Sequence, residues 1–209
     1  IAFDGVNYLF VGGSAGGGGA GCDGRLKGQR IAPSGTPVGG PIDISLSAAR
    51  SNATGLNIAL VFAGPDYFAV YEDTRNANST DIFGRFVGTD GVPKFGEILI
   101  AGGAGNQRDG GAAVGDGKVL VVWMDDGSAQ VRGQLVNFNG TLFGGPIGIG
   151  TAGPNRDTAN VAFNGTDFLV TWSAGSGGPD NFDIEARLVT AAGVPGAQFT
   201  VANAAAKDI

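Results

Sequence analysis

The chain contains no histidine and only one cysteine among its 209 residues. Histidine is the commonest general base and the usual zinc ligand in proteins. Its absence excludes a zinc site and a Ser-His-Asp or Cys-His catalytic apparatus within this chain. The lone Cys22 cannot form an internal disulfide. Any catalysis must therefore use carboxylates, arginines, lysines or tyrosines.

Positive charge and long apolar runs are also scarce. The net charge is −6 and the basic residues form no stripe, so we expect no nucleic-acid partner. The apolar runs have the length of strands, far below that of a membrane span, so we expect no membrane insertion. Because the sequence begins at Ile1 without a signal peptide, we expect a processed form or an excised piece of a larger parent protein.

One pattern of about fifty residues recurs four times along the chain. Its first phrase reads IAFDGVNYLFVG, LVFAGPDYFAVY, AVGDGKVLVVW and VAFNGTDFLVTW, and a second phrase follows each copy. Alignment brings four residues to one position, at steps of 59, 52 and 49 residues: Gly12, Tyr71, Trp123 and Trp172. Such a period is typical of a propeller or a solenoid, whose repeats bury their faces only against their neighbours.

Each copy predicts a four-stranded antiparallel sheet. A short first strand meets a tight turn with strong hairpin signals, namely Asp4-Gly5, Gly64-Pro65-Asp66, Gly115-Asp116-Gly117 and Asn164-Gly165. The second strand is almost wholly apolar, which predicts burial on both of its faces. The third strand carries a small residue at a fixed place, namely Gly28, Gly84, Gly133 or Ala186. A brief alternating strand follows after another glycine turn.

These features favour an all-β fold, a β-propeller of four four-stranded antiparallel blades. A β-sandwich would leave one face of each sheet exposed to solvent, and polar and apolar residues would then alternate more strictly along each strand. We expect a single domain with blades at approximately 1–52, 53–107, 108–156 and 157–209. Joining the chain ends would give a step of 49 residues, which equals the third internal step. Two arrangements stay open, a closed ring of four blades and a slice of a wider propeller.

Two segments of the sequence resemble a known repeat. IAFDGVNYLFV, together with VYEDTRNANSTDIFGRFVGTDGVP, is similar to a repeat found in tandem in large secreted bacterial proteins, where it is taken to form β-propeller blades. The resemblance covers essentially the whole chain and is weakest in the first copy, where GGSAGGGGAG replaces the aromatic and acidic segment. It implies an extracellular propeller and identifies no catalytic residue.

Loop lengths distinguish the two faces of the predicted propeller. The turns between strands 1 and 2 and between strands 3 and 4 are short, whereas the loop between strands 2 and 3 spans 16, 13, 10 and 14 residues between aligned positions. Variable loops on a rigid scaffold are where binding commonly occurs. The candidate ligand-binding residues on this face are Tyr71, Asp73, Trp123, Asp125 and Trp172. The aromatic members either pack the blades together or form a stacking platform for a sugar or another flat ligand.

Acidic residues gather on the same variable-loop face. They are Glu72, Asp73 and Asp81 in one blade, Asp125 and Asp126 in the next, and Asp180 and Asp183 in the last. Such carboxylates could bind a hard cation, form a glycosidase pair or serve only as turn residues.

A basic-acidic doublet recurs in the connections that follow three of the blades. It appears as Arg108-Asp109, Arg156-Asp157 and Lys207-Asp208. Its repetition indicates the same structural role in each blade. In this role each doublet joins one inter-blade connection to the neighbouring one through charge-assisted hydrogen bonds. The alternative is a ring of carboxylates near the propeller axis that binds a cation, with Asp109, Asp157 and Asp208 as metal ligands and Ca²⁺ as the candidate ion. The sequence requires no other cofactor.

The sequence favours a non-enzymatic extracellular propeller, secreted or at the cell surface. We expect it to bind a glycan or protein ligand on the variable-loop face, or to act as a structural module. The first alternative is a carboxylate-based glycoside hydrolase or lyase, which needs two carboxylates facing one pocket. The second is a subunit of a self-associating surface assembly, a homo-oligomer with open blade edges. No catalytic residue is selected by the sequence.

Overall fold

A computed structural model describes residues 1–13, 25–46, 57–75, 79–153, 156–175 and 182–203, and these residues form four antiparallel sheets of four strands each. In every sheet the strands are neighbours in chain order. The predicted all-β propeller architecture, with four four-stranded blades, is confirmed.

Within the described ranges the strands follow one another without helices. The first blade contains β1 (Ala2–Phe3), β2 (Tyr8–Gly13), β3 (Leu26–Ile31) and β4 (Pro37–Asp43). The second contains β5 (Ile58–Ala63), β6 (Asp66–Asp73), β7 (Asp81–Gly88) and β8 (Pro93–Ala101). The third contains β9 (Gln107–Gly115), β10 (Lys118–Asp125), β11 (Gln130–Asn137) and β12 (Leu142–Gly148). The fourth contains β13 (Arg156–Phe163), β14 (Asp167–Gly175), β15 (Phe182–Thr190) and β16 (Pro195–Ala202). In the part of the chain that is described, no helix is long and apolar enough to cross a membrane.

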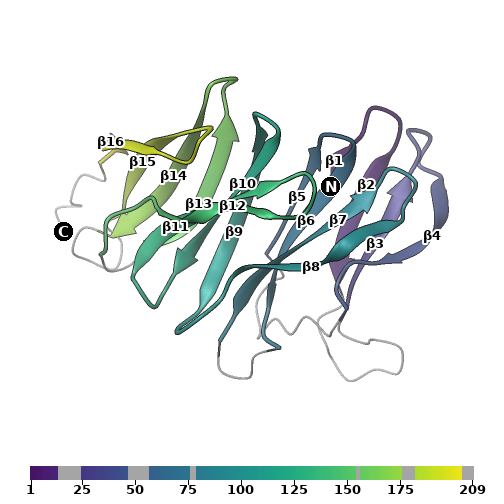
Figure 1. Ribbon diagram of the computed structural model, residues 1–209, viewed down its shortest axis with the longest axis horizontal. Helices are drawn as coiled ribbons and strands as arrows, with labels where there is room; N and C mark the ends of the chain where they lie inside the picture. Colours follow the sequence, from purple (N-terminus) through teal and green to yellow (C-terminus); the bar gives the residue numbers. More distant parts are fainter. Residues whose placement is uncertain (14–24, 47–56, 76–78, 154–155, 176–181, 204–209) are drawn as a thin grey trace, which may run out of the picture.

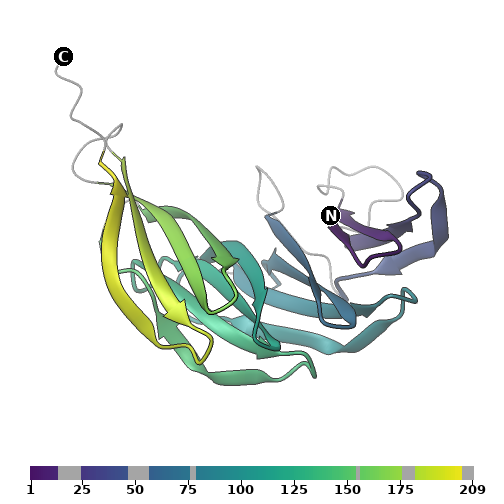
Figure 2. The same ribbon diagram turned by 90° about the horizontal axis from the view of Figure 1, so that it is seen from above.

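The four blades stand in a curved row that does not close on itself (Figure 1). The first strands, β1, β5, β9 and β13, lie on the concave side, and neighbouring ones contact each other. The last strands, β4, β8, β12 and β16, lie on the convex side, and the first and fourth blades stand at opposite ends (Figure 2). The described residues therefore form an open arc, which fits a slice of a propeller better than a closed four-bladed ring.

The four blades share one strand register. The small residue of each third strand lies opposite the residue that precedes the aligned aromatic position, as in the pairs Val70–Gly84 and Val122–Gly133. A Cβ atom on Gly84 would lie 2.4 Å from the Phe68 ring, so the small residue is needed for the core to pack above it.

The turn between the third and fourth strands is the same in every blade. Its glycines have φ values of 84°, 87°, 82° and 84° at Gly35, Gly91, Gly140 and Gly193. In each turn the glycine N–H donates to the carbonyl three residues earlier, at 2.8 to 3.0 Å. Only glycine adopts this left-handed conformation without a steric cost, which explains why the residue recurs.

The hydrophobic core consists of three clusters, and each cluster lies between two neighbouring blades. β6 and β10 are buried on both faces, as the apolar second strands predict. The same expectation is wrong for β2 and β14, where buried and exposed residues alternate. These two strands belong to the end blades of the arc, which have a neighbour on one side only.

Candidate functional site

The aligned aromatic residues lie inside the interfaces between blades. Tyr71, Trp123 and Trp172 are only 1–2% exposed. Trp123 packs in the cluster between the second and third blades, and Trp172 in that between the third and fourth. The stacking-platform hypothesis for these rings is therefore wrong, because no ring face is open to a sugar. Their role is to pack the blades together, which was the other alternative.

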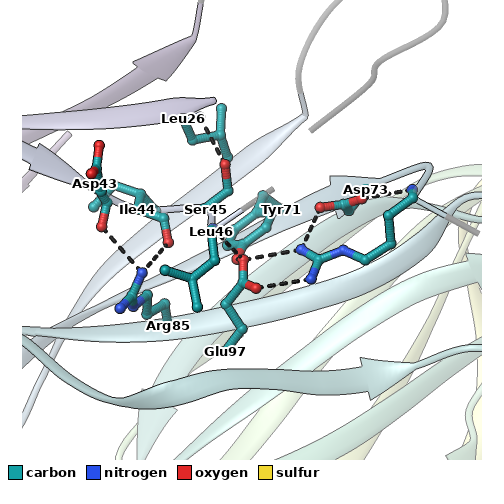
Figure 3. A network of polar contacts seen from close by, with 10 residues as sticks. Leu26, Asp43, Ile44, Ser45, Leu46, Tyr71, Asp73, Arg85 and Glu97 are labelled. Carbon is teal, nitrogen blue, oxygen red and sulfur yellow. Dashed lines mark hydrogen bonds and ion pairs between the residues drawn. The ribbon is translucent and has the colours of Figure 1, made fainter. Parts of the chain in front are cut away.

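Tyr71 and Asp73 belong to a buried ionic network between the first two blades (Figure 3). The Tyr71 hydroxyl donates to Glu97 Oε1 at 2.6 Å. Arg75 donates to both Glu97 oxygens at 2.8 and 3.0 Å and to Asp73 Oδ2 at 2.5 Å. The backbone N–H of Leu46, which follows the first blade, also donates to Glu97 Oε1 at 2.9 Å. Asp73 is fully buried and paired, so it serves this network and is not open to a ligand.

A second set of contacts runs along the same seam between the blades. Arg85 donates to the carbonyl oxygens of Asp43 and Ile44 at 3.3 and 3.1 Å. The hydroxyl of Ser45 accepts a hydrogen bond from the backbone of Leu26 at 2.9 Å (Figure 3). The hydrogen bonds drawn in Figure 3 thus join the first two blades.

The network holds Glu97 in its ionised form. Burial alone would raise the pKa of this carboxyl, but the hydrogen bonds from Arg75, Tyr71 and the Leu46 backbone outweigh it and lower the pKa to about 2. Burial, together with the hydrogen bond to Glu97, raises the pKa of the Tyr71 hydroxyl. The carboxylate thus contributes stability above its unfolded-state pKa, near 4.5, and this contribution is lost as the pH falls towards 2.

Replacing Glu97 with glutamine is expected to lower the free energy of unfolding at pH 7 by about 2 kcal/mol, since Arg75 is partly exposed and the ion pair is partly screened. The variant should also lose part of the acid-induced destabilisation between pH 4.5 and 2. The fourth blade carries Gln198 at the equivalent place, where Oε1 accepts the Thr151 N–H at 3.2 Å, so the glutamine fits the fold. Urea unfolding as a function of pH measures both effects; an unchanged pH profile would contradict the assignment.

Asp125 is also engaged within its own blade. Its Oδ1 accepts the backbone N–H of Ser128 at 3.1 Å, and its Oδ2 accepts Arg132 Nη1 at 3.3 Å. Asp125 therefore closes the tight loop between β10 and β11. Among the described residues, none of the three predicted aromatic rings has an open face, and the carboxylates of Asp73 and Asp125 both accept hydrogen bonds.

The basic-acidic doublets do not occupy equivalent places in the fold. Val122 pairs with Gly111 and Thr171 pairs with Asn160, and each pair is followed by a bulge in the first strand. Asp109 and Thr158 therefore share one position, and both have a left-handed backbone, with φ of 57° and 55°. The expectation of a doublet repeated at one place is wrong by one residue, because Asp109 and Asp157 are 48 residues apart whereas the aligned positions Trp123 and Trp172 are 49 apart.

Of the three predicted metal ligands, only Asp109 has a side chain among the described residues. Asp208 and the side chain of Asp157 lie outside the described residues. The Asp109 carboxylate accepts Arg108 Nη1 at 2.5 Å and Asn57 Nδ2 at 3.1 Å. Over the described ranges, no group of three or more acidic, histidine or cysteine residues is arranged to hold a metal ion. A calcium site at these three aspartates stays a prediction.

The contacts of Asp109 identify a different cluster, on the concave side of the arc. The Asp109 backbone N–H donates to Glu72 Oε1 at 2.7 Å, across the interface between the second and third blades. Arg108 donates from Nε to Asp126 Oδ1 at 3.0 Å as well as to Asp109. We call the set Asn57, Glu72, Arg108, Asp109 and Asp126 the axial cluster.

Local structure explains why these side chains meet. Asp109 lies at the bulge near the start of β9, an innermost strand, and Asn57 directly precedes β5. Glu72 lies near the end of β6, where it shares a face with the core residues Phe68 and Val70 and is directed towards the third blade. The fold thus brings two carboxylates from different blades to the same edge of the interface.

Glu72 and Asp109, two of the three carboxylates of the axial cluster, are in different electrostatic environments. Burial raises the pKa of the Glu72 carboxyl above its ordinary value, and the charge of Asp109 adds to the rise. The hydrogen bond from the Asp109 backbone and the charge of Arg108 oppose it without cancelling it. Asp109 is 28% exposed and is paired with the guanidinium of Arg108. The arrangement can hold a proton on one carboxyl group beside an ion-paired carboxylate, which is what general acid catalysis needs.

Comparison with known proteins gives matches in structure alone. No family model and no curated protein matches the chain. A GH43 endo-arabinanase from Bacillus licheniformis has a TM-score of 0.50 at 12% identity, covering 98% of this chain and 79% of that one. An α-L-arabinofuranosidase from Lactobacillus brevis has a TM-score of 0.53 at 10% identity, covering 92% and 72%. An exo-β-1,3-galactanase from Phanerochaete chrysosporium has a TM-score of 0.51 at 10% identity, covering 94% and 48%.

These likenesses support the propeller fold and correct the expected function. The sequence favours a non-enzymatic binding or structural module, whereas the similar structures are those of an endo-arabinanase, an arabinofuranosidase and a galactanase. All three are enzymes that cleave glycans. The comparisons therefore contradict the non-enzymatic interpretation and leave its first alternative, a carboxylate-based glycoside hydrolase, as the hypothesis to test.

Proposed function

We propose that this protein is a glycoside hydrolase that uses Glu72 and Asp109 as its reactive carboxyl groups. The observation that carries the proposal is the junction between them, where the Asp109 backbone donates to Glu72 at 2.7 Å while Glu72 has a raised pKa. A pair of carboxyl groups whose environments differ is the arrangement with which glycosidases divide the roles of acid and base.

Glu72 is the group suited to be the general acid. Its raised pKa keeps a proton on the carboxyl at a pH where an ordinary glutamate has lost it. That proton passes to the glycosidic oxygen as the bond between this oxygen and the anomeric carbon breaks. The leaving sugar then departs as a neutral alcohol.

Asp109 is the group suited to be the second carboxylate. Its side chain is partly exposed and is held by Arg108 and Asn57, which fix its orientation. It either removes a proton from the attacking water or attacks the anomeric carbon itself, and the separation of the two carboxyl groups in the complex with substrate decides between these routes. In both routes water supplies the oxygen that completes the new reducing end.

The substrate class follows from the comparisons and from the position of the cluster. The similar structures are named for arabinan, arabinofuranoside and β-1,3-galactan cleavage, so arabinose- and galactose-containing polysaccharides are the first substrates to test. The axial cluster lies on the concave side of the arc, where an extended glycan could reach it. A secreted or cell-surface location, suggested by the resemblance to tandem repeats of secreted proteins, stays a prediction.

Replacing Asp109 with asparagine is expected to lower the rate of reducing-end release from the active polysaccharide by about 10²–10⁴-fold. Asparagine adopts the left-handed backbone of this position as readily as aspartate, so the bulge should be retained. The assay compares the wild-type chain with the variant on arabinan, β-1,3-galactan and aryl arabinofuranosides.

The matched control is Asp116→Asn, which removes an exposed carboxylate from the tight turn between β9 and β10 on the opposite face. This control should keep wild-type activity. A wild-type chain that releases no sugar from any of these substrates would contradict the proposed function. Equal activity of the wild type and Asp109→Asn would contradict the role given to Asp109.

A further inference from the structure

A groove of about 410 Å³ opens between the first two blades, on the convex side of the arc where β4 and β8 lie (Figure 2). Arg30, Gly39 and Gly40 line it from the first blade, and Asp90 and Gly91 line it from the turn before β8. We call it the rim groove. It has the volume of a small binding pocket, and it lies between two described blades, away from the axial cluster on the concave side.

At the next interface, between the second and third blades, an aromatic ring fills the corresponding place. The Phe95 ring lies over Gly140, since a Cβ atom on that glycine would be 2.9 Å from Phe95 Cδ2. The Phe86 ring meets it edge to face, with centroids 5.9 Å apart and planes at 88°. Phe95 has a φ of 58°, which is unfavourable for a bulky residue, so the packing of its ring offsets a backbone cost.

The first interface has the same backbone without the ring. In strand register, Gly39 occupies the position of Phe95. Its φ of 71° lies in the same left-handed region, and a Cβ atom there would meet no atom within 4 Å. Arg30 takes the position of Phe86, and Gly91 is the turn glycine that a ring would cover. The rim groove is therefore open because the first blade carries glycine where the second carries phenylalanine.

The Arg30 guanidinium places a positive charge in the rim groove. Its Nη1 donates to the Asp90 carbonyl oxygen at 3.0 Å, while its buried Nε has no hydrogen-bond partner among the described residues. The face of an aromatic ring is negative and attracts a guanidinium. This chain makes such a contact elsewhere, where Arg75 lies 4.0 Å from the centroid of the Phe83 ring. The residue equivalent to Arg30 in the third blade is Leu135, which offers no charge.

Two carboxylates line the rim groove beside this guanidinium. Asp43 is paired with Lys27. The exposed Asp90 carboxylate accepts the backbone N–H of Val92 at 2.9 Å, a hydrogen bond that leaves its negative charge uncompensated. A ligand with a positive charge next to its ring would complement Asp90, whereas a negative charge there would be repelled.

We propose that the rim groove binds an aromatic side chain of a partner polypeptide, with its ring over Gly91 and against the Arg30 guanidinium, and with a lysine or arginine next to it that pairs with Asp90. The inference is independent of the proposed function. It depends on the ring that the chain itself places at the next interface, and on the exchange of Phe86 for a cation in the first.

The experiment follows the backbone amide signals of the isotope-labelled full chain by nuclear magnetic resonance during titration with blocked dipeptides. The Phe-Lys dipeptide is expected to shift the signals of Gly39, Gly40 and Gly91 in a saturable way. A dipeptide with cyclohexylalanine in place of phenylalanine has a similar shape without the aromatic face, and should bind about 3- to 10-fold more weakly. The Phe-Glu dipeptide should bind about 2- to 5-fold more weakly, because its charge faces Asp90.

Two variants and a control identify the site. Gly39→Phe should fill the rim groove with its own ring, as Phe95 does at the next interface, and abolish binding. Gly144→Phe is the matched control, since Gly144 is the equivalent glycine of the third blade, with φ of 66° and open space at its Cβ position, and it should bind as the wild type does. Arg30→Leu should weaken binding of Phe-Lys by about 3- to 10-fold and remove its preference over cyclohexylalanine.

Three results would overturn the proposal. The first is a wild-type chain whose rim-groove signals do not respond to Phe-Lys, including the case in which they respond to arabinan oligosaccharides instead. The second is equal binding of Phe-Lys by the wild type and a folded Gly39→Phe variant. The third is equal binding of the phenylalanine and cyclohexylalanine dipeptides by the wild type, which decides the role of Arg30 even if Gly39→Phe does not fold.

Discussion

Replacing Glu72 with glutamine should lower kcat/KM for glycoside cleavage by about 10²–10⁴-fold and leave the stability of the fold nearly unchanged. Glutamine cannot supply the proton that the leaving oxygen needs. Its carbonyl oxygen can still accept the Asp109 N–H that now reaches Glu72 at 2.7 Å. Burial disfavours the charged form of Glu72 and raises its pKa, so we expect an uncharged amide to be tolerated at this position.

Glu97→Gln provides the matched comparison for this variant. It removes a carboxylate from the network between the first two blades, away from the contacts of Asp109. It should lower stability and keep kcat/KM at temperatures where the chain is folded, whereas Glu72→Gln should do the opposite. If both variants keep wild-type activity, Glu72 is not the general acid.

Replacing Trp123 with alanine is expected to lower the free energy of unfolding by about 3–5 kcal/mol, the usual cost of truncating a buried tryptophan. The side chain is only 2% exposed and fills the cluster between the second and third blades. Urea unfolding followed by circular dichroism measures the loss. A variant of unchanged stability would mean that the ring is not part of the core.

A pair of phenylalanine variants separates packing from hydrogen bonding in the two tryptophans. Trp172 Nε1 donates to Glu185 Oε2 at 3.0 Å, whereas Trp123 Nε1 is buried and has no hydrogen-bond partner among the described residues. Trp172→Phe should therefore cost about 1–2 kcal/mol more than Trp123→Phe, because only the former removes a hydrogen bond to a carboxylate. Equal losses would show that the Glu185 contact adds no stability.

The architecture could be predicted because several local signals agree with one another. The glycines of the turn between the third and fourth strands recur where a positive φ is needed, and Gly84 and Gly133 recur where a side chain would enter the core. The aromatic residues could not be assigned from the sequence alone. Tyr71 and Trp172 suit a core and a binding platform equally well, and only the packing of neighbouring blades decides between them.

The candidate site was harder to predict because it depends on register and on contacts between blades. Asp109 and Thr158 are separated by the same 49 residues as Trp123 and Trp172, but the sequence does not show that this position is a bulge with a left-handed backbone. One feature of the sequence does point to Glu72. It lies two residues after Val70 and four after Phe68 on β6, so its side chain is on the same buried face of the strand as these two core residues. Its contact with Asp109 joins residues of two blades, which no local pattern could show.

The dependence of kcat/KM on pH, measured between about pH 3 and 8 on the active polysaccharide, tests most directly whether Glu72 is the acid of a glycoside hydrolase. We predict activity that falls on the alkaline side at a pH above the ordinary glutamate pKa of 4.5, because the proton on Glu72 is retained to a higher pH and its loss ends catalysis. This alkaline limb should disappear in the residual activity of Glu72→Gln. An alkaline limb that is unchanged in that variant, or a wild-type chain without hydrolytic activity at any pH, would contradict the assignment.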